Sequence, residues 1–140
     1  LGSGRPFSSY GPGLNVHLPT HFIQIALRWP RPTIDDRIAA RYERQMAAGF
    51  LEEVDALRAA RPARTAAQAL GYRELLAYLD GECTLADALE TAVARTRRFA
   101  RRQERWFRRD PRIMWIDAPP DPRAVLALWD AARASQTPAR

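Results

Sequence analysis

The sequence has no lysine, a single cysteine (Cys83) and no long hydrophobic run. One cysteine excludes an internal disulfide and is typical of a protein from a reducing cytoplasm. No apolar stretch approaches the ~20 residues that cross a bilayer, and the first residues carry no signal-peptide pattern. The sequence therefore predicts a soluble cytoplasmic protein without a membrane partner.

Several kinds of catalytic site are also missing from the sequence. There is no glycine-rich phosphate loop, no nucleophile elbow and no pair of carboxylates placed for acid–base catalysis. The two histidines, His17 and His21, flank Pro19 without a cysteine or carboxylate cluster beside them, so we expect no metal site there. The chain therefore offers no candidate for a catalytic base or a metal ligand.

Composition and the two ends of the chain predict one folded domain. With 140 residues and 46% hydrophobic side chains, the chain can build a single core. Glycine, proline and serine are frequent in residues 1–21, so we expect a loop there, a folded part over 22–134 and a disordered tail over 135–140. Because the chain opens with Leu1 and a loop-like stretch, we expect an amino-terminal part of the protein to precede it.

Hydrophobic periodicity and turn residues predict a mostly helical chain with two short strands. The expected elements are, in order, a strand over 22–28, a helix capped by Thr33 and broken at Gly49, a helix from 50 to a stop at Pro62, a helix over 66–79, a helix opened by Thr84 and Asp87 and ended at Asp110-Pro111, a strand over 113–117, and a helix capped by Asp121 and opened by Pro122. Two isolated short strands do not make a stable sheet. We therefore expect an α/β fold in which they are edge pieces of a larger sheet.

Residues 95–109 are the most informative stretch, because eight of these fifteen residues are arginine. At 100° per residue, the apolar side chains share one half of a helix surface and the arginines fill the other half. The apolar half comprises Leu89, Val93, Phe99, Ala100, Trp106 and Phe107. We expect this half to pack into a core and the arginine half to present guanidinium groups that hold phosphates in pairs.

Two polar residues interrupt the apolar half of this helix. Thr96 and Gln103 lie seven residues apart, which places them above one another on the same face. A polar side chain on a buried stripe needs a hydrogen-bond partner. The spacing therefore predicts specific hydrogen bonds at Thr96 and Gln103.

The arginine face has two interpretations. A solvated charged helix face is common in proteins. However, Glu104 is the only acid among residues 95–109, so i,i+4 ion pairs within the helix cannot offset the repulsion between arginines. The whole chain carries 22 Lys and Arg against 16 Asp and Glu, a net charge of +6, with a pI near 10.6. A basic stripe on so basic a chain is typical of proteins that bind nucleic acid.

Two further motifs suit phosphate and base recognition. Arg37 and Arg41 lie one turn apart and could clamp a pyrophosphate, although Asp36 and Glu43 could equally pair with them. Gly71 falls inside the predicted helix over 66–79, where glycine costs about 1 kcal/mol against alanine. The Tyr72-Arg73 pair beside it could stack on a base and hold a phosphate. A glycine needed for helix–helix packing is the alternative.

A series of motifs occurs in order along the chain. They are Gly4-Arg5-Pro6-Phe7-Ser8, Leu27-Arg28-Trp29-Pro30-Arg31, Arg37-Ile38 with Arg41, Met46, Gly49-Phe50, Glu53-Val54, Ala69-Leu70-Gly71-Tyr72-Arg73-Glu74, Tyr78-Leu79-Asp80-Gly81, Thr96-Arg97 through Ala100-Arg101-Arg102-Gln103 to Trp106-Phe107-Arg108, and Trp115-Ile116-Asp117. In this order they resemble the carboxy-terminal half of bacterial tRNA dimethylallyltransferases, also called tRNA isopentenyltransferases. The combination of the motif at 71–74 with the arginine-rich motif is specific to that family.

The resemblance implies a fold and a reaction. The fold would be α/β, with this chain as a mostly helical fragment with two short strands, the carboxy-terminal part of a P-loop-like αβ core. The reaction would transfer the dimethylallyl group of dimethylallyl diphosphate to N6 of adenine 37 in tRNAs that read codons beginning with U, with Mg²⁺ as cofactor. In the family the catalytic base and the phosphate loop belong to the amino-terminal half, so no catalytic residue or metal ligand is assigned here. We therefore expect the isolated chain to be inactive.

The resemblance also implies partners and site residues. The partners would be the anticodon stem-loop of tRNA and dimethylallyl diphosphate, with the protein a monomer and no membrane involved. Arg41 matches a family arginine near the diphosphate, and Arg37 is a second candidate. Two segments match tRNA contacts: Gln68, Ala69, Leu70, Gly71, Tyr72 and Arg73 form the first, and Ala94, Arg95, Thr96, Arg97, Arg98, Phe99, Ala100 and Arg101 form the second.

A stand-alone basic RNA-binding module without catalysis is the alternative function. The upstream part of the gene separates the two possibilities. A Walker-type glycine-rich loop encoded there favours the enzyme, whereas a start codon directly before Leu1 favours the module.

Overall fold

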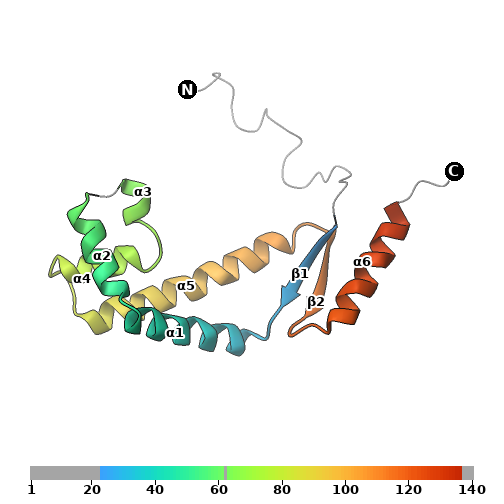
Figure 1. Ribbon diagram of the computed structural model, residues 1–140, viewed down its shortest axis with the longest axis horizontal. Helices are drawn as coiled ribbons and strands as arrows, with labels where there is room; N and C mark the ends of the chain where they lie inside the picture. The colour runs from blue at the N-terminus through green and yellow to red at the C-terminus, as the bar shows by residue number, and fades with distance from the viewer. Residues whose placement is uncertain (1–22, 62, 137–140) are drawn as a thin grey trace, which may run out of the picture. The chain divides into compact units, whose positions relative to one another are not determined.

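The computed structural model describes residues 23–61 and 63–136 (Figure 1). The elements are β1 (Gln24–Arg28), α1 (Arg31–Ala47), α2 (Phe50–Ala59), α3 (Arg64–Ala67), α4 (Tyr72–Leu79), α5 (Leu85–Phe107), β2 (Ile113–Asp117) and α6 (Pro122–Gln136). This mostly helical chain with two strands confirms the predicted α/β fragment. The predicted loop over 1–21 lies outside the described residues.

The described chain divides into two compact units, which we call the helical unit and the sheet unit. The helical unit is Pro30–Gln103, and the sheet unit comprises the described residues up to Trp29 and from Glu104 onward. None of the described helices is both long enough and apolar enough to cross a membrane.

The helical unit contains all the described residues that are fully buried. Its core consists of Tyr42 from α1, Phe50 and Val54 from α2, Leu75 from α4, and Ala88 and Ala92 from α5. Ile38 and Met46 pack against this cluster one turn on either side of Tyr42, as expected for one face of a helix. The core therefore joins four helices through one face of each.

The sequence correctly predicts the start of α5. The Thr84 hydroxyl accepts a hydrogen bond from the Asp87 backbone N–H at 3.2 Å, and the Asp87 carboxylate accepts one from the Thr84 N–H at 3.3 Å. This reciprocal pair satisfies two N–H groups at the beginning of the helix. The predicted cap of α6 is also present, because the Asp121 carboxylate accepts a hydrogen bond from the Arg123 N–H at 2.9 Å.

Three predicted boundaries were wrong. Helix α1 starts at Arg31 rather than after Thr33, because a proline in its first turn has the backbone angle that a helix start requires. The predicted helix over 66–79 is two helices, since Gly71 has a φ of +90° that no helix contains. Helix α6 runs through Gln136, so two residues of the predicted disordered tail are helical and the rest of that tail lies outside the described residues.

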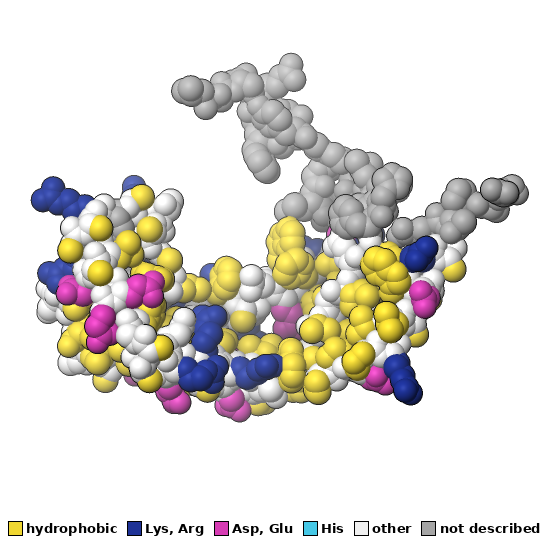
Figure 2. Space-filling view, in the orientation of Figure 1, with side chains coloured by type: hydrophobic (Ala, Val, Ile, Leu, Met, Phe, Trp, Pro, Cys, Tyr) yellow, Lys and Arg dark blue, Asp and Glu magenta, His cyan; other side chains and the backbone are white. Residues whose placement is uncertain are grey.

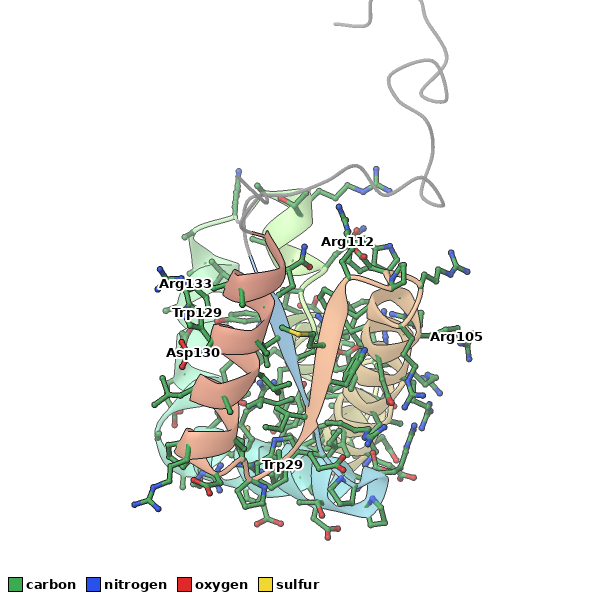
Figure 3. The ribbon with its side chains drawn as sticks, turned by 90° about the vertical axis from the view of Figure 1, so that its right-hand side faces the viewer. Trp29, Arg105, Arg112, Trp129, Asp130 and Arg133 are labelled. Carbon is green, nitrogen blue, oxygen red and sulfur yellow. The ribbon has the colours of Figure 1, made fainter. Side chains whose placement is uncertain are left out.

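In the sheet unit, β1 and β2 pair in parallel, with Gln24 opposite Ile113 and Arg28 opposite Asp117. Arg28 Nε donates a hydrogen bond of 2.7 Å to Asp117 Oδ1 at the end of this ladder. The bond raises the pKa of Arg28 and lowers the pKa of Asp117 from its ordinary value. The two strands predicted from separate parts of the sequence are therefore direct neighbours, with α6 running beside them (Figures 1 and 3).

Large hydrophobic side chains are exposed on the sheet unit (Figure 2). Those on this unit are Leu27, Trp106, Phe107, Leu126 and Trp129. The prediction that the aromatic residues of α5 pack into a core was wrong for the described chain, where Phe99 is 41% exposed, Trp106 55% and Phe107 40%. The physical reason is that the buried stripe of α5 ends at Thr96, before these aromatic residues.

Candidate nucleic-acid interface

Three successive residues of α5 bond to other helices of the helical unit. Arg95 Nη1 donates a hydrogen bond of 2.6 Å to Glu74 Oε1 on α4. The hydroxyls of Thr96 and Tyr42 share a hydrogen bond of 2.9 Å, and Arg97 Nη2 donates to the backbone carbonyl of Asp35 at 3.1 Å. These bonds fasten α5 to both α4 and α1.

Glu74 is the most buried acid among these partners, at 4% exposure. One of its carboxylate oxygens accepts the Arg95 bond, and the other accepts the Gly71 backbone N–H at 2.9 Å. A buried carboxylate is stable only when it is paired and hydrogen-bonded, and Glu74 meets both conditions. Arg95 therefore forms an ion pair with Glu74 on another helix. Residue spacing within α5 alone does not predict this pair.

The outward face of α5 carries the arginines without such partners. Arg98 and Arg101 are exposed, as are Arg102 and Arg105 further along the helix (Figure 3 labels Arg105). Among the described residues, none of these four forms an ion pair with a carboxylate, whereas Arg108 pairs with Glu104 at 2.6 Å. The predicted arginine face of α5 is therefore exposed in the structure. Arg95 and Arg97 are not part of it, because they bond to other helices.

The two polar residues of the predicted apolar stripe behave differently. Thr96 is 8% exposed and has the hydrogen-bond partner that its position predicts, Tyr42. Gln103 is exposed, so the prediction of a buried hydrogen bond was wrong there. Phe99, on the same side as Gln103, lies under Arg102, whose guanidinium carbon is 5.7 Å from the ring centre.

The first predicted tRNA segment forms the connection from α3 to α4 and the first two residues of α4. Gln68, Ala69 and Arg73 are exposed, Leu70 is half-buried and Gly71 is buried. A Cβ built on Gly71 would lie 3.2 Å from ring atoms of both Phe50 and Tyr42. Gly71 is thus required for a positive φ and for close packing of two aromatic rings, which supports the packing interpretation of this glycine.

Tyr72 is held by α2. Its hydroxyl donates a hydrogen bond to Glu53, and its ring meets Phe50 edge-on with centroids 5.1 Å apart. The bond to the Glu53 carboxylate raises the pKa of Tyr72 above its ordinary value. Arg73 has no such anchor in the helical unit and lies at the surface.

Replacing Gly71 by alanine should destabilise the chain by about 1–3 kcal/mol, the usual cost of a strained backbone position. Gly81→Ala is the matched control, because Gly81 has a φ of +80° but no atom within 4 Å of a built Cβ. Urea denaturation of both variants separates backbone strain from the contact with Phe50 and Tyr42. Equal losses of stability would show that this contact contributes nothing.

Arg37 and Arg41 lie on the exposed side of α1, and Figure 2 shows arginine side chains at the surface over this helix. The guanidinium carbon of Arg41 lies 5.8 Å from the centre of the Tyr42 ring. No carboxylate among the described residues lies within ion-pair distance of Arg41, so the predicted alternative of pairing with Asp36 or Glu43 is not found for Arg41. Arg41 keeps its charge available at the surface.

One pocket of the helical unit brings the two predicted tRNA segments together. Its volume is about 360 Å³, and Arg73 of the first segment and Arg95 of the second both line it. Glu74, Asp80, Glu82 and Asp87 also line it, so acids outnumber arginines in the wall. A phosphate would be repelled there, and the exposed face of α5 suits a polyanion better than the pocket does.

The described residues contain no cluster of ligands for the Mg²⁺ that the resemblance implies. No three His, Cys, Asp or Glu side chains are grouped so as to hold a metal ion within the described part of the chain. Mg²⁺ needs oxygen ligands in near-octahedral geometry. No Mg²⁺ ligand is therefore assigned among the described residues.

Comparison with known proteins identifies the fold and then the family. The crystal structure of a tRNA isopentenylpyrophosphate transferase from Bacillus halodurans is 32% identical, with a TM-score of 0.70 over 81% of this chain and 38% of that chain. The structure of the corresponding Staphylococcus epidermidis protein has a TM-score of 0.71 at 24% identity over 82% of this chain, which supports the fold alone. The fold is therefore that of part of these transferases.

The sequence model of the IPP transferase family matches residues 1–110, and the chain belongs to that family. A tRNA dimethylallyltransferase from Thermobifida fusca is 50% identical over 121 residues, which cover 84% of this chain and 37% of that protein. One from a Nocardioides species is 49% identical over 116 residues and is also covered to 37%. The chain thus spans little more than a third of the length of these relatives.

Proposed function

We propose that this chain is the tRNA-contacting part of a cytoplasmic enzyme that transfers a dimethylallyl group from dimethylallyl diphosphate to N6 of adenine 37 in the tRNA anticodon loop. Membership of the family supports the reaction class. The observation that carries the role of this part is the exposed, unpaired face of Arg98 and Arg101 on α5. Guanidinium groups along one face suit the phosphates of an RNA backbone.

Arg41, with Arg37 one turn before it, would bind the diphosphate of the prenyl donor. In the reaction N6 of adenine forms a bond to the allylic carbon, the carbon–oxygen bond breaks, and pyrophosphate leaves with the electron pair. The N6 proton passes to a base that this chain does not supply. A guanidinium at the departing pyrophosphate stabilises the negative charge that develops there. The exposed, unpaired state of Arg41 supports this assignment.

The test compares the complete product of the gene with the 140-residue chain. Each is incubated with dimethylallyl diphosphate, Mg²⁺ and unmodified tRNA, and prenylated adenosine is measured by mass spectrometry. We expect product from the complete gene product and none from the isolated chain, because the chain has no phosphate loop and no candidate base. Prenylated adenosine from the isolated chain would contradict its expected inactivity.

The same experiment also tests the alternative function, an RNA-binding module without catalysis. If the complete gene product binds tRNA but transfers no prenyl group, the chain belongs to an RNA-binding module without catalysis. A mutated tRNA with another base at position 37 is the control for the site of transfer. Equal product on that tRNA would contradict the assignment to adenine 37.

A further inference from the structure

One buried tyrosine contacts both predicted tRNA segments and the predicted diphosphate arginine. Tyr42 on α1 is 3% exposed, and its hydroxyl shares the 2.9 Å hydrogen bond with Thr96 of the second segment. Its ring lies against Gly71 of the first segment, where a Cβ would be 3.2 Å from Tyr42 Cε1. Arg41, the preceding residue, holds its guanidinium carbon 5.8 Å from the centre of the same ring.

These contacts fix the depth and the orientation of the Tyr42 ring. A buried hydroxyl without a partner is unfavourable, so the bond to Thr96 holds the hydroxyl end in place. The Gly71 backbone, held in turn by Glu74, limits movement at the ring edge. Because the Arg41 guanidinium lies over this ring, a shift of Tyr42 displaces the charged group as well.

A second bond connects the same two helices. Arg97 Nη2 donates to the Asp35 carbonyl near the start of α1, while Tyr42 meets Thr96 two turns further along α1. Two attachment points between α1 and α5 set the rotation of α1 as well as its distance. Arg98 and Arg101 on α5 and Arg41 on α1 are therefore held in one fixed arrangement within the helical unit.

We infer that Tyr42 is a positioning residue that, through Thr96 and Gly71, aligns the Arg41 guanidinium with the diphosphate when RNA occupies the two tRNA segments. This inference rests on the proposed function. It gives the Tyr42 hydroxyl a role in prenyl transfer without contact with either substrate.

The experiment removes and restores this hydrogen bond in the complete gene product. The variants are Tyr42→Phe, Thr96→Val, both together, and Thr96→Ser, which keeps the hydroxyl. We expect Tyr42→Phe and Thr96→Val each to lower kcat/KM for dimethylallyl diphosphate about fivefold or more, with an unchanged Kd for tRNA. The double variant should be no worse than either single variant, because both remove one bond. Thr96→Ser should retain wild-type kinetics.

Tyr78→Phe is the matched control. Tyr78 packs against the same core from α4 and has no part in the proposed site, so its kinetics should not change. Melting temperatures identify any variant that fails to fold. If Tyr42→Phe does not fold, the comparison of Thr96→Val with Thr96→Ser decides the question.

Three results would overturn the inference. They are a weakened Kd for tRNA in the single variants, single-variant effects that multiply in the double variant, and kinetics of Tyr42→Phe that match those of Tyr78→Phe in an active enzyme. The last of these leaves the proposed function standing. If the wild-type gene product transfers no prenyl group, the proposed function fails and the inference falls with it.

Discussion

Replacing Arg41 by alanine in the complete gene product should lower kcat for prenyl transfer by about tenfold to a thousandfold, the range for losing one donor to a developing charge. Arg41 is exposed on α1, and no carboxylate of the described chain neutralises it. A guanidinium that meets the departing pyrophosphate acts mainly in the transition state, so kcat should fall together with kcat/KM. Steady-state kinetics with a varied diphosphate concentration measure the effect.

Arg44→Ala is the matched control for this prediction. Arg44 is exposed on the same helix and three residues further on, so its removal takes away an equal charge. We expect the Arg44 variant to keep its kcat, and both variants to keep their affinity for tRNA. An Arg41 variant with normal kcat and weakened tRNA binding would mean that Arg41 is a nucleic-acid contact.

Replacing Arg98 and Arg101 together by alanine should weaken binding of cognate and non-cognate tRNA alike. Each phosphate contact that is lost should reduce the slope of log affinity against log salt by roughly 0.7 to 0.9, and the pair by about one to two units. The structure favours this pair over Arg97 with Arg101, because Arg97 bonds to the Asp35 carbonyl. Filter binding across a salt series measures both the affinity and the slope.

Two comparisons make this measurement specific. Arg44→Ala with Arg64→Ala removes the same charge from exposed positions on α1 and α3 and should leave the slope nearly unchanged. Arg95→Ala should lower the melting temperature instead, since it leaves the buried Glu74 carboxylate without its ion pair. A full salt slope in the Arg98 and Arg101 variant would mean that α5 presents only a solvated charged face.

Local rules predicted much of the helical unit. The Thr84 and Asp87 pair and the hydrogen bond of Thr96 are both predicted from positions within a few turns of one helix. Each depends on spacing, which the sequence displays directly. The assignment to the family likewise followed from motifs in order along the chain.

The wrong predictions concerned side chains whose surroundings come from other helices or strands. Periodicity shows that Phe99 and Trp106 share a helix face, but not whether another element covers that face. Spacing within α5 could not show the partners of Arg95 and Arg97, because Glu74 and Asp35 come from other helices. For Gly71, spacing predicted a helix interior, whereas its left-handed backbone lies against the rings of Phe50 and Tyr42, which come from other helices. The site residues themselves stay predictions until the variants are measured.

The parallel pairing of β1 with β2 has a consequence for the order of folding. The Arg28 to Asp117 bond joins residues 89 positions apart, and the entire helical unit lies between the two strands in the sequence. Closing so long a connection costs chain entropy that local helix formation does not, so the helices can form early and the strand ladder only afterwards. A chain cut at residue 110, where the match to the family ends, would retain the helical core but leave β1 with its hydrogen-bonding edge unpaired. The short segment beyond the family match therefore supplies the strand that pairs with β1 in the described part of the chain.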